Sequence, residues 1–191
     1  ITHTGTISNT DMATLSSLAG TGNSYNITVA KTSNAVPSVD AGALKTLNSK
    51  VTNPITVTAT NISGALSDVK DIYDANTAGE ITGLGNEVVV ISDTGTVLAS
   101  DLVDVNGLTS QVVTVNGVTG VSGTLADIKA VYAANSAGTI TGLGNESISI
   151  SDLGTIVSAS DIADIEALTT GTVSVALSGT TVTASTLNNL D

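Results

Sequence analysis

Short segments in which β-branched apolar residues alternate with threonine or serine recur along the 191-residue chain and predict β-strands. The segments are 26–30, 55–59, 88–92, 112–116, 148–151 and 172–176. Because successive side chains of a strand point to opposite faces, we expect one set to be buried and the other exposed. The predicted buried set is Ile27, Val29, Ile55, Val57, Val89, Ile91, Val113, Val115, Ile148, Ile150, Val173 and Val175. The predicted exposed row, mostly hydroxyl groups, is Thr28, Thr56, Val90, Thr114, Ser149 and Ser174.

A second pattern, apolar residues at three-residue spacing, predicts short helices that each bury one stripe. The stripes are Met12-Leu15-Leu18, Leu44-Leu47, Leu66-Val69-Ile72, Leu102-Val105-Leu108, Leu125-Ile128-Val131, Ile162-Ile165-Leu168 and Leu187-Leu190. Serine or threonine followed by aspartate lies at several helix starts, as in Thr10-Asp11, Ser100-Asp101 and Ser160-Asp161, and predicts N-caps with an acidic first turn. The segments 81–87 and 140–146, both ITGLGNE, are predicted turns whose glycines adopt positive φ.

An internal repeat sets the fold class. Residues 62–109 recur almost residue for residue at 121–169, and each copy divides into two strand–corner–helix units. Strands alternating with short helices require parallel pairing and right-handed crossovers. We therefore predict an α/β fold: a right-handed solenoid of about seven units, with one continuous parallel β-sheet and a row of short helices. Residues 1–191 are expected to form a single repeat-array domain, a fragment of a longer array that continues in both directions.

Charge and composition exclude several classes of partner. The chain has 17 acidic residues, five lysines and no arginine, for a net charge of −12. Nucleic acids and anionic membranes require a basic surface, so neither is an expected partner. No segment approaches the apolar length of a membrane-spanning helix, so we expect no membrane insertion in this segment. The absence of cysteine excludes disulfides and thiolate metal sites.

Candidate catalytic residues are few. The single histidine, His3, lies two residues from the first residue of the sequence, so a histidine-based triad is not expected. Carboxylate pairs can act in glycoside hydrolysis, but the acids of this chain are copied between the repeats, as Asp68 is by Asp127 and Asp101 by Asp161. An active site is usually one unique constellation, whereas a residue present in every unit usually has a structural role. We therefore predict that the protein is not an enzyme.

Calcium is the one predicted cofactor, because loops rich in carboxylate and amide oxygens offer the ligands that this ion prefers. The candidate ligands are Asn86, Glu87 and Asp93 in the first copy and Asn145, Glu146 and Asp152 in the second. Turn and helix-cap roles for the same residues remain the alternative, and the absence of any cofactor is the corresponding prediction. The predicted hydroxyl row also resembles the flat faces of ice-binding solenoids, although Val90 interrupts it.

The repeated motifs GLGNExxxISDxGT and SGTLADIKAVYAA resemble the tandem repeats of giant secreted or cell-surface proteins of bacteria, especially marine cyanobacteria. The resemblance implies a secreted or cell-surface location and a structural role as a rigid spacer, adhesin stalk, surface-layer component or filament-forming segment. The alternative is a calcium-, glycan- or ice-binding solenoid module. The expected partners are further copies of the same repeat, in one chain or end to end, and surface glycans.

Overall fold

The protein is an α/β structure built from parallel sheets and five helices within the residues that the structure describes. The computed structural model describes Met12, Thr14, Leu15, Ser17 and residues 21–29, 38–152 and 158–176. The predicted helix stripe at Leu187-Leu190, the cap at Thr10-Asp11 and Leu18 of the stripe Met12-Leu15-Leu18 lie outside these residues. The chain divides into two compact units. Unit 1 contains residues 1–92 and 105–114, and unit 2 contains residues 93–104 and 115–191.

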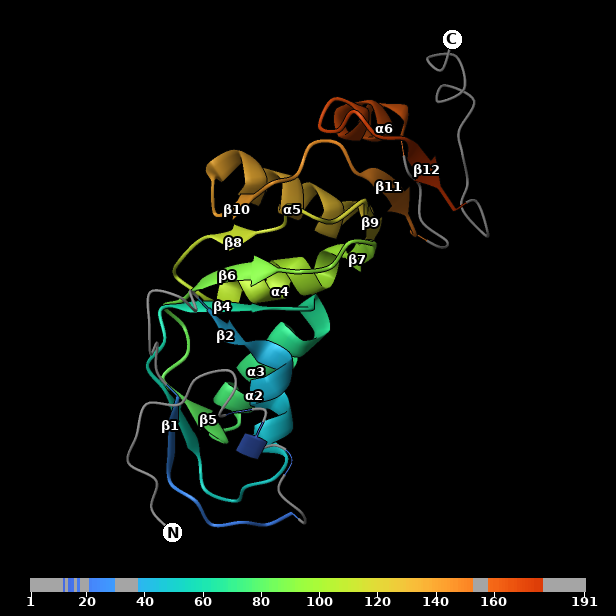
Figure 1. Ribbon diagram of the computed structural model, residues 1–191. Coiled ribbons are helices and arrows are strands. Elements are labelled where there is room, and N and C mark those ends of the chain that lie inside the picture. Colours follow the sequence, from blue (N-terminus) through green and yellow to red (C-terminus); the bar gives the residue numbers. More distant parts are fainter. Residues whose placement is uncertain are drawn as a thin grey trace. The chain divides into compact units, whose positions relative to one another are not determined.

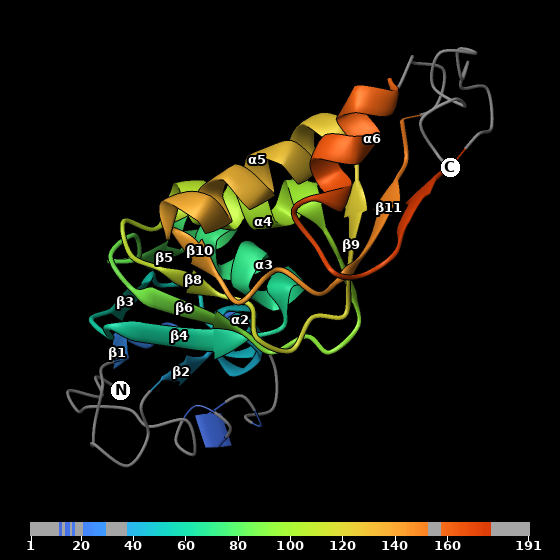
Figure 2. The same cartoon turned by 90° about the horizontal axis from the view of Figure 1, so that it is seen from above.

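Within the described residues, unit 1 contains seven of the strands and two complete helices, labelled in Figure 1 except for β3, which is labelled in Figure 2. In chain order they are β1 (Ile27–Val29), β2 (Val39–Asp40), α2 (Ala41–Asn48), β3 (Ile55–Val57), β4 (Asn61–Gly64), α3 (Leu66–Thr77), β5 (Ile81–Thr82), β6 (Val88–Ile91) and β8 (Val113–Thr114). Strands β1, β3 and β5 form one parallel sheet, and β8, β6, β4 and β2 are neighbours in that order in a second. The registers are unbroken: Ile27 pairs with Ile55, and Ile55 with Ile81.

Unit 2 contains β7 (Thr96–Leu98), β9 (Gly120–Gly123), α5 (Leu125–Ala137), β10 (Ile140–Thr141), β11 (Ser147–Ile150), α6 (Ala159–Glu166) and β12 (Val173–Val175). Its parallel sheet has the order β12-β11-β9-β7. Figure 2 shows α5 and α6 on the same side of β9 and β11. Helix α4 (Ala99–Leu108) contributes residues 99–104 to unit 2 and 105–108 to unit 1.

The six predicted strands and the predicted burial pattern are confirmed, with one exception at the end of the described chain. Ten of the twelve residues predicted as buried are at most 3% exposed, among them Val29, Ile55 and Ile150. Val173 and Val175 are only half-buried. Strand β12 is the edge of its sheet, so β11 is its one described strand neighbour. Removing a large aliphatic side chain from water stabilises the fold by about 1.5–3 kcal/mol, so the buried residues dominate the core.

The predicted single sheet and single exposed row are wrong. Thr28 and Thr56 lie in the β1-β3-β5 sheet, Val90 on β6, and Ser149 and Ser174 in the β12-β11-β9-β7 sheet, so the row is divided among three sheets. Val90 interrupts only the row of its own sheet, where it lies between Ser63 and Thr114, and the rows of the other two sheets are free of it. Thr28, Thr56 and Thr82 are in register on three neighbouring strands, and so are Ser122, Ser149 and Ser174.

Two predicted N-caps are also wrong, because both helices begin two residues earlier than predicted. Ser100 and Ser160 lie inside α4 and α6. The N-cap of α6 is Ser158, whose extended backbone lets its hydroxyl oxygen accept a hydrogen bond from the N–H of Asp161. The predicted positive φ of the ITGLGNE glycines is confirmed at Gly83, Gly85, Gly142 and Gly144.

Candidate functional site

A buried tyrosine–glutamate contact is the most distinctive polar feature of unit 1. Tyr73 lies on the inward face of α3, and its hydroxyl donates a 3.0 Å hydrogen bond to Oε2 of Glu87, which precedes β6. The N–H groups of Gly85 and Asn86 donate to the same oxygen at 2.8 and 3.1 Å. Thr109, after α4, donates its hydroxyl to the Glu87 carbonyl oxygen at 2.6 Å. Tyr73, Glu87 and Thr109 form what we call cluster 1.

Unit 2 contains the same arrangement, which we call cluster 2. Tyr132 on α5 donates a 3.0 Å hydrogen bond to Oε2 of Glu146, and the N–H of Gly144 donates to that oxygen at 2.8 Å. The hydroxyl of Thr169 donates to the Glu146 carbonyl oxygen at 2.6 Å. The sequence repeat therefore extends to buried hydrogen bonds with matching partners and lengths.

The two clusters differ at the glutamate carboxylate. Glu87 is 2% exposed and Glu146 is 0% exposed, so neither carboxylate has effective access to water. Glu87 receives a third hydrogen bond from the N–H of Asn86. Oε1 of Glu146 is buried and has no hydrogen-bond partner among the described residues.

Burial controls the protonation of the tyrosines. The pKa of Tyr73 and of Tyr132 is raised, first because burial disfavours the phenolate, and then because the negative charge of Glu87 or Glu146 opposes a second anion. Each hydroxyl therefore remains a proton donor and joins a helix to the following ITGLGNE loop. The loop packs closely where its first glycine lies, since a Cβ at Gly83 would collide with the carbonyl oxygen of Val57.

The predicted calcium ligands are not brought together around one point. Asn86 Oδ1 accepts hydrogen bonds from Ser110 and Gln111, whereas Glu87 points into cluster 1. Asp93 lies beyond the other end of β6, and four strand residues span about 13 Å.

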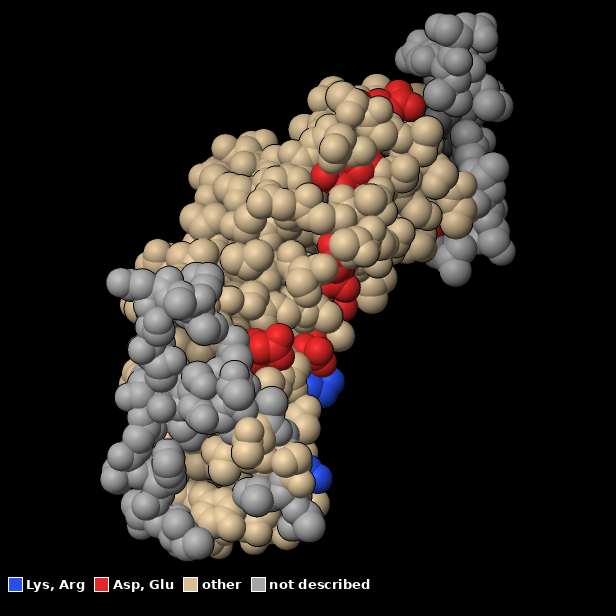
Figure 3. Space-filling model, in the orientation of Figure 1, with Lys and Arg blue, Asp and Glu red and all other residues tan. Residues whose placement is uncertain are grey.

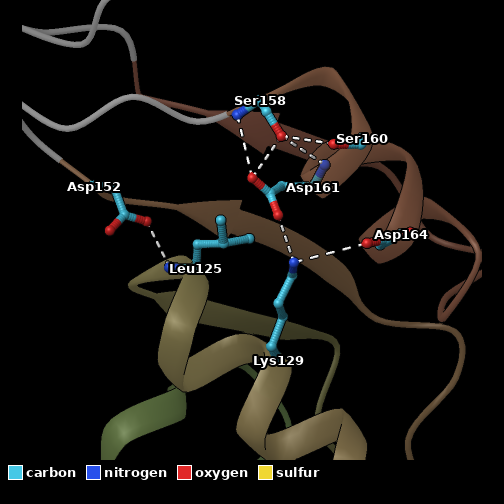
Figure 4. A network of polar contacts seen from close by, with 7 residues as sticks. All are labelled: Leu125, Lys129, Asp152, Ser158, Ser160, Asp161 and Asp164. Atoms are coloured by element: carbon cyan, nitrogen blue, oxygen red, sulfur yellow. Dashed lines mark hydrogen bonds and ion pairs between the residues drawn. The ribbon is translucent and has the colours of Figure 1, made fainter.

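In the second copy the same separation holds. Asn145 is exposed, Glu146 points into cluster 2, and Asp152 follows β11 and accepts a hydrogen bond from the N–H of Leu125, the first residue of α5 (Figure 4). Within the described ranges no group of three or more histidine, cysteine or acidic side chains is placed to hold a metal ion. Calcium binding stays a prediction.

Lysines join neighbouring helices in each unit. Lys45 on α2 contacts Asp68 and Asp71 on α3, with Nζ–O distances of 2.8 and 2.6 Å. Figure 4 shows the matching contact in unit 2, where Lys129 on α5 reaches Asp161 and Asp164 on α6. The hydrogen bond to Asp161 raises the pKa of Lys129 and lowers that of Asp161. These contacts are exposed and each contributes little alone.

The surface of unit 1 also has an open groove of about 810 Å³ between the end of α2 and the end of α3. Its lining includes Lys45, Asn48, Asp71, Asp74 and Glu80. Asn48 donates to Glu80 at 2.9 Å, so part of the lining is already satisfied internally. Acidic side chains also form most of the charged surface visible in Figure 3. Three of the four charged side chains that line the groove are acidic.

Sequence reasoning identified Glu87 and Glu146 but missed their partners Tyr73, Thr109, Tyr132 and Thr169. The available signal was the constant spacing of tyrosine and glutamate in both copies.

No described helix is long and apolar enough to span a membrane. Comparisons with protein-family models, curated proteins and solved structures gave no match.

Proposed function

We propose that this chain is a structural repeat module: a stiff right-handed solenoid segment that serves as a spacer, adhesin stalk, surface-layer component or filament-forming segment of a secreted or cell-surface protein. The observation that carries the proposal is the duplication of the buried cluster. Tyr73, Glu87 and Thr109 make the same bonds in unit 1 as Tyr132, Glu146 and Thr169 make in unit 2. A residue set copied with its buried contacts serves the stability of each repeat.

The strand pairing supports the solenoid part of the proposal. Ile27, Ile55 and Ile81 are in register on successive parallel strands, as are Val121, Ile148 and Val173. Each step along these sheets advances the chain by one strand-containing turn. This stepwise stacking is how a solenoid builds its length.

Small-angle X-ray scattering of the chain and of a head-to-tail fusion of two copies tests the proposal. A solenoid extends along one axis, so the fusion is expected to have about twice the maximum dimension and an unchanged cross-sectional radius of gyration. Two copies that collapse into one globule would instead raise the overall radius of gyration only about 1.3-fold. That outcome, or a thicker cross-section, would contradict the spacer role.

A further inference from the structure

An Asn-Gly pair lies in an exposed turn at the start of the second segment of unit 2. The sequence has two such pairs, Asn106-Gly107 and Asn116-Gly117. Asn116 and Gly117 form the turn between β8 and β9, and both residues are exposed. Asn106 and Gly107 lie instead inside α4, near its last residue. The same dipeptide therefore occurs in two different backbone environments of one chain.

The chemistry of an Asn-Gly pair depends on its backbone environment. The amide nitrogen of the glycine can attack Cγ of the asparagine side chain and close a five-membered succinimide ring. Glycine favours this step because no Cβ hinders its nitrogen and its backbone reaches the conformations that ring closure needs. The nitrogen must also be exposed and free of a hydrogen bond, because it has to lose its proton.

The turn at Asn116-Gly117 meets these requirements. Among the described residues, the Gly117 N–H has no hydrogen-bond acceptor and the Asn116 side chain has no hydrogen-bond partner. Asn116 Oδ1 lies against the backbone of Gly142, where a Cβ would collide with it. This packing contact involves the carboxamide oxygen, and the residue as a whole remains exposed.

The pair inside α4 does not meet them. In an α-helix each N–H donates to the carbonyl oxygen four residues earlier, so the Gly107 N–H belongs to the hydrogen-bond ladder of the helix. The fixed helical dihedral angles also prevent the rotation that ring closure needs. The Asn106 side chain is partly covered, since its Oδ1 is buried. Asn106-Gly107 is therefore a matched control within the same chain.

We propose that Asn116 is a site of spontaneous deamidation and that the fold protects Asn106 from the same reaction. The Gly117 nitrogen bonds to Asn116 Cγ, the bond from Cγ to the carboxamide nitrogen breaks, and that nitrogen leaves as ammonia with the proton lost by Gly117. Water then opens the succinimide at either carbonyl carbon and gives aspartate or isoaspartate at position 116. No oxidant or reductant takes part.

The reaction changes both the charge and the length of the turn. Either product adds a negative charge beside Gly142, and isoaspartate also adds a main-chain carbon between β8 and β9. The site goes beyond the structural role proposed above, because its chemistry depends only on the local turn.

Peptide mapping by tandem mass spectrometry tests the proposal after incubation of the whole folded chain in mildly alkaline buffer. Digestion at acidic pH then limits further reaction. A parallel sample is incubated in urea, where both pairs lose their structure and should react at similar rates. In the folded chain we expect aspartate and isoaspartate to form at position 116 about tenfold or more faster than at position 106, because a helical amide reacts only after local opening.

A variant identifies the reacting side chain independently of the mapping. Isoaspartyl methyltransferase transfers a labelled methyl group to isoaspartate, so the incubated wild-type chain should become labelled. Asn116→Gln keeps a carboxamide but needs a six-membered ring, which closes far more slowly, and its labelling should fall to background. Labelling of the folded variant at the wild-type level would place the reaction elsewhere and overturn the proposal.

Two results of the mapping would also overturn it. Equal rates at the two positions in the folded chain would mean that the fold does not select the site. Product at position 116 in urea but not in the folded chain would mean that packing against Gly142 protects the asparagine.

Discussion

At the scale of single residues, the two clusters depend on tyrosine hydroxyls that keep their protons. Burial and then the neighbouring glutamate raise the pKa of Tyr73 and Tyr132 in the folded chain. In the unfolded chain tyrosine ionises near pH 10. The stability that the hydroxyls contribute is therefore complete below about pH 10 and is lost as the pH rises above it. We expect the urea midpoint to fall progressively as the pH rises above about 10.

Phenylalanine substitutions separate this contribution from that of the lysines, because Lys45 and Lys129 also have raised pKa values and act in the same direction. The variant Tyr73→Phe/Tyr132→Phe should lose about 1–3 kcal/mol per site at neutral pH, since each substitution removes one hydrogen-bond donor from a buried carboxylate. It should also show a shallower fall at alkaline pH. If stability falls equally steeply with alkaline pH in this variant and in the wild type, the tyrosine–glutamate contacts do not cause the loss of stability.

At the scale of elements, helix α6 shows how a short helix is fixed at its start. The Ser158 hydroxyl accepts from the Asp161 N–H at 3.1 Å, and the Asp161 carboxylate accepts from the Ser158 N–H at 3.3 Å, which is a reciprocal capping box. Ser158→Ala is expected to lower the free energy of unfolding by about 1 kcal/mol.

Ser160→Ala is the matched control, because Ser160 lies inside α6 and its hydroxyl contacts Ser158 but caps no backbone N–H. Its expected effect on the urea midpoint is smaller than that of Ser158→Ala. A larger effect of Ser160→Ala would place the cap at the position that the sequence pattern first favoured.

The type of an element was predictable where the identities of its side chains indicate a strand or a helix. It was less predictable where close backbone packing determines the residues. β-branched alternation located β1, β3, β6, β8, β11 and β12, but β4 and β9 were missed because their sequences, NISG and GVSG, are poor in strand-forming residues. Close packing explains the glycines. A Cβ at Gly64 would lie 2.8 Å from the Ala41 Cβ, and one at Gly120 would lie 2.5 Å from Thr96 Oγ1. Such contacts are made with segments distant in the sequence, so the residues around each glycine do not indicate a strand.

The candidate site was predictable only in part for a similar reason. Duplicated loops identified Glu87 and Glu146 as a matched pair, and an acid in a glycine-rich turn suggested a surface ligand. Their burial depends on Tyr73 and Tyr132, which lie on preceding helices, and on Thr109 and Thr169, which lie after the following ones. Three segments meet at each cluster, so a one-dimensional pattern could not show that the carboxylates turn inward.

At the scale of the whole molecule, net charge should decide when copies of the chain associate. The net charge of −12 at neutral pH makes separate copies repel one another, and the repulsion weakens with added salt or near the isoelectric point of about 4.1. Self-association of a filament-forming or surface-layer segment should therefore be weak at pH 7 and low salt.

Sedimentation velocity across a concentration series tests this expectation. We expect a monomer at pH 7 and low salt, and a larger weight-average sedimentation coefficient either in high salt at pH 7 or as the pH is lowered towards about 4. Circular dichroism at each pH distinguishes association of folded chains from aggregation of unfolded ones. A monomer that persists under every condition in which the chain stays folded would remove self-association from the proposed role and leave that of a spacer within a longer chain.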